Sequence, residues 1–177
     1  MMGGMIGARH PWRVDSAKPD LRGQVALVTG ANSGLGLQVA LGLAHRGARL
    51  LLPVRDMGRG NAALEQIRAT CPRVDATLLP LDLASLRSVG DCATCVADHT
   101  DRLDILINNA GVMAPTRRPE TADGFELQFG VNHLGHFALT GPVRPLLEAA
   151  PQPGFLSALS ALPQPPPTPH LHVFHTP

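Results

Sequence analysis

Tyrosine is absent from this 177-residue chain, and lysine occurs once, at Lys18. A reaction that depends on a tyrosine phenol or on an internal lysine is therefore excluded for this chain taken alone. Charged residues make up only 16% of the sequence, and 15 Lys and Arg residues nearly balance 14 Asp and Glu residues. This balance does not predict a nucleic-acid-binding protein, which would carry a basic surface.

Long apolar runs and cysteine clusters are also scarce. No apolar run approaches the roughly 18 residues of a membrane span. The amino terminus lacks the apolar core of a secretion signal, so we expect a cytoplasmic protein with reduced thiols. Cys92 and Cys95 form a CxxC inside a predicted helix, but no second ligand pair accompanies them. We interpret them as ordinary helix residues and predict no metal site.

Apolar runs alternate with amphipathic segments through the middle of the chain. Four runs are predicted strands: 24–29, 48–55, 74–83 and 103–109. Helices are predicted between them, with Gly47 ending the first and with Asp56 and Ser85 opening the next two. Residues 125–150 are predicted to form one long helix, loosened by Gly130 and Gly135 and kinked near Pro142.

This alternation is typical of a parallel sheet with helices on both faces. With right-handed crossovers, it predicts an α/β fold, the amino-terminal half of a Rossmann-type doubly wound parallel sheet with about four β-α units. We divide the chain into an amino-terminal arm (1–22), a partial nucleotide-binding domain (23–150) and an irregular proline-rich tail (151–177). The tail holds eight prolines, which remove backbone donors and disfavour further sheet.

A glycine-rich loop, TGANSGLG, occupies residues 29–36 between the first strand and the first helix. Gly30 permits a sharp exit from the strand, Gly34 lets the backbone approach a pyrophosphate, and Gly36 allows close packing of helix and sheet. The amino terminus of the helix offers free N–H groups to the phosphates. The loop therefore predicts a dinucleotide site, with a purely structural turn as the alternative.

The TGxxxGxG spacing resembles that of the short-chain dehydrogenase/reductase family. Three further motifs occur in the family's order: Asp82-Leu83, the NNAG of residues 108–111 and the NHLGHF of residues 132–137. The resemblance covers roughly residues 22–150, and NHLGHF is most similar to the subgroup that contains retinol dehydrogenases. It implies NAD(P)-dependent oxidoreduction of a small apolar alcohol or carbonyl substrate.

The resemblance also implies roles for individual residues. Asp82 would accept a hydrogen bond from the adenine amino group, although a helix-start role is the alternative for this residue. Asn108 would pin neighbouring strands together. The remaining implied cofactor contacts are Gly30, Ser33, Gly34, Leu35 and Gly36 in the diphosphate loop, Leu83 beside Asp82, and Asn109, Ala110 and Gly111 after the fourth strand.

The choice of cofactor depends on the end of the second strand. An NAD enzyme typically places an acidic residue there, but Val54 occupies that position and Arg55 follows it. A guanidinium suits a 2′-phosphate through bidentate charged hydrogen bonds. We therefore expect NADP(H) to be favoured over NAD(H). Asp56 could itself reach a ribose, but capping the next helix is its commoner role.

Catalysis in the family uses an asparagine, a serine, a tyrosine and a lysine four residues after the tyrosine. Asn132 matches the relay asparagine, with a solvated or core-satisfied amide as the alternative. No Tyr or Lys follows it. Ser157 and Ser160 lie where the serine strand is expected, but we assign a catalytic role to neither. His133 and His136 are interpreted as packing or surface histidines.

The sequence thus resembles an NADP(H)-dependent oxidoreductase that is truncated before the Tyr-x-x-x-Lys segment. The alternative is a catalytically inactive nucleotide-binding fragment or an interaction protein. We expect strand Ile105–Asn108 to be an open sheet edge unless residues 155–159 pair with it as a fifth strand. The helix Phe125–Glu148 is a possible homo-oligomer contact, as the family resemblance implies.

Overall fold

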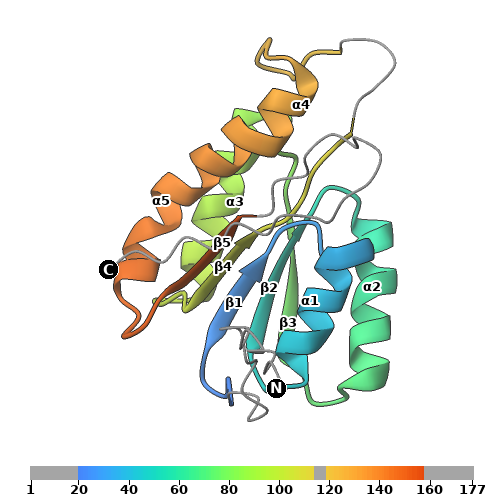
Figure 1. Cartoon of the computed structure of the whole chain (residues 1–177), viewed down its shortest axis with the longest axis vertical. Helices are drawn as coiled ribbons and strands as arrows, with labels where there is room; N and C mark the ends of the chain where they lie inside the picture. The colour runs from blue at the N-terminus through green and yellow to red at the C-terminus, as the bar shows by residue number, and fades with distance from the viewer. Residues whose placement is uncertain (1–19, 114–118, 158–177) are drawn as a thin grey trace, which may run out of the picture.

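The computed structural model describes residues 20–113 and 119–157, which are coloured in Figure 1. Predictions for arm residues 1–19, for Ser160 and for tail residues 158–177 lie outside these described residues.

Five parallel strands form one sheet in the order β3-β2-β1-β4-β5. Their bounds are β1 (Val25–Val28), β2 (Arg49–Val54), β3 (Ala76–Pro80), β4 (Ile105–Asn108) and β5 (Gly154–Ser157). The chain builds outward from β1 in one direction and then returns to add β4 and β5 on its other side. This order confirms the predicted α/β class and the Rossmann-type sheet, whose switch point lies between β1 and β4.

Helices cover both faces of the sheet (Figure 1). Their bounds are α1 (Gly34–Ala44) and α2 (Met57–Thr70) on one face, and α3 (Leu86–His99) and α5 (His136–Glu148) on the other. Successive strand residues point to opposite faces. Ala26 and Leu50 accordingly join the apolar cluster under α1 and α2, whereas Leu27 and Leu51 join the cluster under α3 and α5.

Helix ends follow the sequence signals closely. The Asp56 side chain caps α2 by accepting a hydrogen bond from the Arg59 N–H at 3.0 Å. Ser85 caps α3 through the Ser88 N–H. Gly47 has a φ of 86°, the left-handed conformation that ends α1 and that a glycine adopts without strain. These three predictions are confirmed.

The predicted single helix over 125–150 is wrong, because three helical segments occupy this stretch. A short α4 (Leu127–Phe129) leads into a π-helical segment, η1 (Gly130–Gly135), which continues into α5. A Cβ on Gly135 would lie 2.6 Å from the Leu83 carbonyl oxygen, so the wide turn fits here only without a side chain. Gly130 and Gly135 predict a loosened helix here, but nothing in the sequence pattern predicts the change from α-helix to π-helix.

The prediction of an open edge at β4 is also wrong. β5 pairs with β4 in parallel, with Ile105 opposite Gly154 and Asn108 opposite Ser157. Residues 155–159, whose pairing with β4 was the stated exception to an open edge, do pair over their described part, Phe155–Ser157. Regular structure therefore extends past residue 150, into the segment that the sequence predicts to be an irregular tail. Proline at positions 151 and 153 does not prevent this, because both prolines precede the strand.

Candidate dinucleotide-binding site

The glycine loop lies at the carboxyl ends of β1 and β4. Gly30 has a φ of 69°, and a Cβ at this position would lie 2.9 Å from the Ala110 Cα. A Cβ on Gly36 would overlap both the Gly30 carbonyl oxygen and the Asn109 side-chain amide. Both glycines therefore permit close contact between the loop, α1 and the end of β4, as the sequence predicted.

The outer part of the loop has an open surface and an uncapped helix end. Gly34 has a φ of 54°, and a Cβ there would meet no atom within 4 Å. Ser33 occupies the cap position of α1 but makes no side-chain cap hydrogen bond, and Ser33 and Leu35 are exposed. By contrast, α2 and α3 are capped by their own side chains. The first N–H groups of α1 are thus left available to an anion.

Arg55 is exposed immediately after β2, and its guanidinium makes no ion pair within the described part of the chain. Asp56 is committed to the cap of α2, as predicted. The hydrogen bond from the Arg59 backbone N–H lowers the pKa of the Asp56 carboxyl, and the nearby guanidinium groups act in the same direction. Arg55 thus acts on Asp56 only through its charge, and it forms no ion pair with any other described residue.

Asp82 and Leu83 follow β3, and their contacts are largely internal. The Asp82 carboxylate accepts a hydrogen bond from the Ala84 N–H at 2.9 Å, while the Asp82 N–H donates to the Ser88 hydroxyl at 2.9 Å. Asp82 is half-buried, and within the described residues its second carboxylate oxygen accepts no hydrogen bond. The Leu83 side chain is buried in the core under α3 and α5, and its carbonyl oxygen lies against Gly135 of η1.

A fully buried threonine, Thr29, holds the segment after β4. Its hydroxyl oxygen accepts hydrogen bonds from the N–H groups of Asn109 and Ala110, at 2.9 and 3.0 Å. The Asn109 side chain donates in turn to the Thr29 carbonyl at 3.0 Å. These bonds fix the backbone of residues 109–110 against the end of β1, beside the glycine loop.

The Thr29 hydroxyl also contacts the Nε2 atom of His136 at 2.9 Å. Both lone pairs of that oxygen are occupied by backbone N–H groups, so its own proton points to Nε2. His136 Nδ1 lies 3.2 Å from the Asn132 carbonyl oxygen, which only accepts, and Nδ1 therefore carries the ring proton. His136 is buried, with 4% of its surface exposed, and burial lowers the pKa of the imidazole. The ring is thus neutral and in a defined tautomer.

Asn132 lies in η1, and its side chain clamps the same segment from the other side. Its amide oxygen accepts from the Val112 N–H at 2.8 Å, and its amide nitrogen donates to the Val112 carbonyl at 3.0 Å. A Cβ on Gly111 would lie 3.2 Å from that amide oxygen. The half-buried Asn132 therefore fixes the loop through backbone contacts, which the sequence pattern did not specify.

Asn108 links the sheet to a helix, which corrects the prediction that it pins neighbouring strands. Its side-chain nitrogen donates to the Thr140 hydroxyl of α5 at 3.0 Å, and that hydroxyl donates to the His136 carbonyl at 2.7 Å. The Asn108 amide oxygen is buried without a hydrogen-bond partner among the described residues. Ser157 lies opposite Asn108 in the sheet register.

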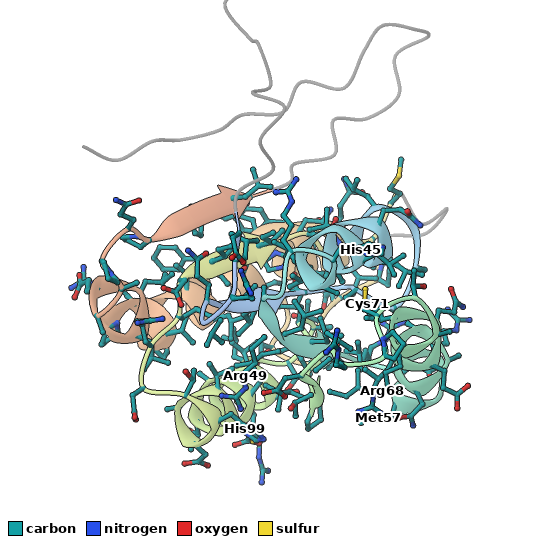
Figure 2. All side chains as sticks on the ribbon, turned by 90° about the horizontal axis from the view of Figure 1, so that it is seen from below. His45, Arg49, Met57, Arg68, Cys71 and His99 are labelled. Carbon is teal, nitrogen blue, oxygen red and sulfur yellow. The ribbon has the colours of Figure 1, made fainter. Side chains whose placement is uncertain are left out.

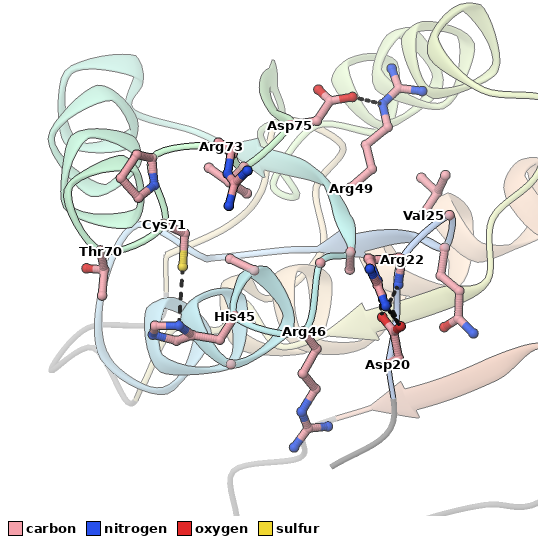
Figure 3. A pocket seen from close by; sticks show the side chains of 18 residues that line it. Asp20, Arg22, Val25, His45, Arg46, Arg49, Thr70, Cys71, Arg73 and Asp75 are labelled. Atoms are coloured by element: carbon pink, nitrogen blue, oxygen red, sulfur yellow. Dashed lines mark hydrogen bonds and ion pairs between the residues drawn. The ribbon is translucent and has the colours of Figure 1, made fainter.

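A cavity of about 1380 Å³ lies at the opposite, amino-terminal edge of the sheet (Figure 3), and His45, Arg49 and Cys71, which Figure 2 labels, are among its lining residues. It contains the ion pair between Arg49 and Asp75 at 3.1 Å and a contact of 3.5 Å between Cys71 and His45. No residue of the glycine loop lines it. Nucleotides bind at the carboxyl ends of strands in this type of fold, so the cavity is separate from the candidate site.

No group of three His, Cys, Asp or Glu side chains among the described residues is placed to hold a metal ion. In residues 20–113 and 119–157, no helix has both the length and the apolar character to cross a membrane.

Residues 24–154 match the family model for short chain dehydrogenases, which covers most of the chain. The chain therefore belongs to the short-chain dehydrogenase family. It is 46% identical over 148 residues to human retinol dehydrogenase 13, an alignment that covers 82% of this chain and 44% of that protein. The resemblance to the retinol dehydrogenase subgroup is confirmed. The chain spans less than half the length of the curated relatives it matches.

Solved structures agree with this assignment. A metagenomic short-chain oxidoreductase in complex with NADP superposes with a TM-score of 0.69 and 31% identity, covering 85% of this chain and 67% of that one. A short chain dehydrogenase/reductase from Burkholderia phymatum in complex with NAD superposes with a TM-score of 0.65 and 25% identity. This alignment covers 78% of this chain and 49% of that one. Structural neighbours thus include complexes with both dinucleotides, and the family as a whole uses NAD(P).

Proposed function

We propose that this chain binds NADP(H) in preference to NAD(H), as the nucleotide-binding part of an oxidoreductase for alcohols or carbonyl compounds. The observation that carries the proposal is the uncapped amino terminus of α1 beside the open surface at Gly34. Donor groups at a helix amino terminus that no described side chain caps suit a pyrophosphate. The residues present therefore fit a dinucleotide.

Each part of the cofactor would have its own contact in this site. The exposed Ser33 hydroxyl and the α1 N–H groups would hold the phosphates, and the open oxygen of Asp82 would accept from the adenine amino group. The backbone of Asn109, Ala110 and Gly111 would run along the nucleotide. A bound nicotinamide supplies or accepts a hydride in this family. This chain's own residues orient the cofactor but offer no tyrosine or internal lysine to move the proton.

Preference for NADP(H) rests on Arg55. Its side chain is exposed and unpaired next to a position where an acidic residue would favour NAD, and Val54 occupies that position. We expect Arg55→Ala to weaken NADPH binding about tenfold while leaving NADH binding within twofold, which calorimetric titration measures directly. Arg59→Ala is the matched control, because Arg59 pairs with Asp56. Equal affinity of the unmutated chain for both cofactors would contradict the assignment.

A non-catalytic nucleotide-binding or interaction protein is the second candidate, and the absence of tyrosine favours it for this chain taken alone. We expect the purified chain to bind NADPH without oxidising it in the presence of aldehydes or ketones. Loss of absorbance at 340 nm measures turnover, with a complete retinol dehydrogenase as the positive control. Turnover that persists in His133→Ala and His136→Ala variants would refute this expectation.

Three parts of the proposal go beyond the site. The substrate class, a small apolar alcohol or carbonyl compound, follows from the family and applies to a completed protein. A homo-oligomer contact along Phe125–Glu148 and a cytoplasmic location both stay predictions. Phe137 of α5 is 74% exposed, which is compatible with such a contact.

A further inference from the structure

We propose that His136 is a positioning residue, whose neutral imidazole holds the cofactor segment Asn109–Val112 in place, so that protonation of His136 releases the segment and weakens dinucleotide binding. This inference rests on the proposed function for its effect on binding. Its effect on the segment itself is independent of any ligand.

The segment is held at both of its ends, and both anchors converge on the His136 ring. Thr29 binds the first two N–H groups of the segment, and its hydroxyl proton is directed at His136 Nε2, 2.9 Å away. Asn132 binds Val112 at the other end, and its carbonyl oxygen accepts from His136 Nδ1. One imidazole therefore sets both the orientation of the threonine hydroxyl and the position of the π-helical turn.

The hydrogen bonding at the junction of η1 and α5 leaves this second contact available. The backbone N–H of His136 donates to the His133 carbonyl, three residues back, whereas in a regular α-helix it would donate to the Asn132 carbonyl. The imidazole Nδ1–H bonds to the Asn132 carbonyl instead. The side chain thus substitutes for a backbone contact in the turn that carries Asn132.

Protonation changes the number of donors that compete for one oxygen. An imidazolium carries a proton on both ring nitrogens and has no acceptor. Three donors, His136 Nε2–H and the N–H groups of Asn109 and Ala110, would then face the two lone pairs of the Thr29 hydroxyl. The hydroxyl proton would also lose its acceptor, and the next nearest is the Ile107 carbonyl at 3.5 Å. One of these three donors is then left without an acceptor, and two of the three belong to the segment.

Few ionisable groups surround the ring to complicate this titration. β1, β4 and β5 carry no ionisable side chain. Cys92 and Cys95 of α3, buried and half-buried, pack in the same apolar cluster as α5. Asp82, which follows β3, lies next to Leu83, and Leu83 contacts η1. On its own helical segment, His133 is exposed and stacks on Phe129. Burial, followed by the bond to the Asn132 carbonyl, sets the pKa of His136.

The direction of the pH effect follows from burial. Because burial lowers the pKa of His136, the neutral form persists at pH 7, and proton uptake begins below the ordinary value of 6.5. The folded segment is therefore intact at neutral pH and is released as the pH falls through the lowered pKa. The His136 imidazole of the unfolded chain binds a proton more readily than that of the folded chain, so the free energy of unfolding also declines below pH 6.5.

The test compares His136→Gln, His136→Phe and the control His133→Gln between pH 7.5 and pH 5. The amide oxygen of Gln can accept from the Thr29 hydroxyl and does not titrate, whereas Phe fills the volume without an acceptor. Two readouts are measured: NADPH affinity, and hydrogen-exchange protection factors of the Asn109 and Ala110 amides without nucleotide. The 2′-phosphate of NADPH titrates equally for all variants, so differences between variants report the protein.

We expect NADPH affinity and the protection of both amides to fall in the unmutated chain and in His133→Gln as the pH drops through the lowered pKa of His136, by about tenfold once the ring is protonated. His136→Gln should keep constant protection and lose only the NADPH affinity that titration of the 2′-phosphate removes, and His136→Phe should be low throughout. The same protection profile in the unmutated chain and His136→Gln, or full protection in His136→Phe, would overturn the role of His136. Failure of every variant to bind NADPH would overturn the proposed function instead, and the protection factors would still decide the positioning role.

Discussion

Replacing Thr29 by valine removes one oxygen atom and keeps the shape of the side chain. Thr29 is fully buried, and its hydroxyl oxygen serves two backbone N–H groups and the Nε2 atom of His136. Valine leaves all three of these polar groups without their partner. The substitution therefore measures the hydrogen bonding at the switch point of the sheet separately from its packing.

The expected loss of stability is large for a single atom. An unpaired buried polar group costs about 1–3 kcal/mol. Asn109 and Ala110 are half-buried, so water can partly compensate their N–H groups, and about 1 kcal/mol each is appropriate. His136 is buried, and its unpaired Nε2 adds about 1–2 kcal/mol. We expect Thr29→Val to lower the free energy of unfolding by about 3 kcal/mol, a substantial part of the usual 5–15 kcal/mol.

Urea unfolding, followed by circular dichroism, measures this change as a shift of the midpoint at constant slope. Thr29→Ser is the matched control, because it keeps the hydroxyl and loses one methyl group, at a cost of about 1 kcal/mol. A Thr29→Val variant within about 0.5 kcal/mol of the parent chain, or no more destabilised than Thr29→Ser, would refute the assigned hydrogen bonding.

Two other substitution or modification experiments test the packing. Gly36→Ala should destabilise the fold by more than about 2 kcal/mol, because the added Cβ would overlap Gly30 and Asn109. Gly42→Ala in the same helix is the control: its Cβ meets no atom within 4 Å, so it should stabilise the fold by up to about 1 kcal/mol. Thermal unfolding of the two variants measures the difference. Burial, with a smaller effect of the neighbouring thiol, raises the pKa of Cys92 to about 12. Alkylation at pH 8 should therefore leave Cys92 unmodified in the native chain and modify it after denaturation, which peptide mass spectrometry detects.

Much of the fold is predictable from local pattern because the sheet is parallel and buried on both faces. Such strands are continuous apolar runs, and β1 is buried at all four positions. Asp56 and Ser85 mark helix starts through side-chain chemistry that acts within three residues. β5 was harder to predict, because four residues in a proline-rich segment become a strand only by pairing with β4.

The candidate site is predictable to a different degree. Gly30 and Gly36 have the close contacts that their spacing predicts, because each contact is made within one loop or at the adjacent strand end. The contact between Thr29 and His136 joins residues 107 positions apart, so no local pattern specifies it. A polar residue at the end of an apolar strand and a histidine inside an apolar helix were the only available signals.

The π-helical turn η1 also affects how this region tolerates insertions and deletions. Each residue of an α-helix turns the chain by about 100°, and a π-turn holds one residue more than the regular helix would. Deleting one residue within Gly130–Gly135 would restore a regular helix and leave the ends of the segment nearly in place. Deleting one residue within α5 would instead rotate everything after it by about 100°, turning the buried Leu139 and Val143 away from the sheet. The same single-residue deletion should therefore be tolerated in one half of this helical stretch and disruptive in the other.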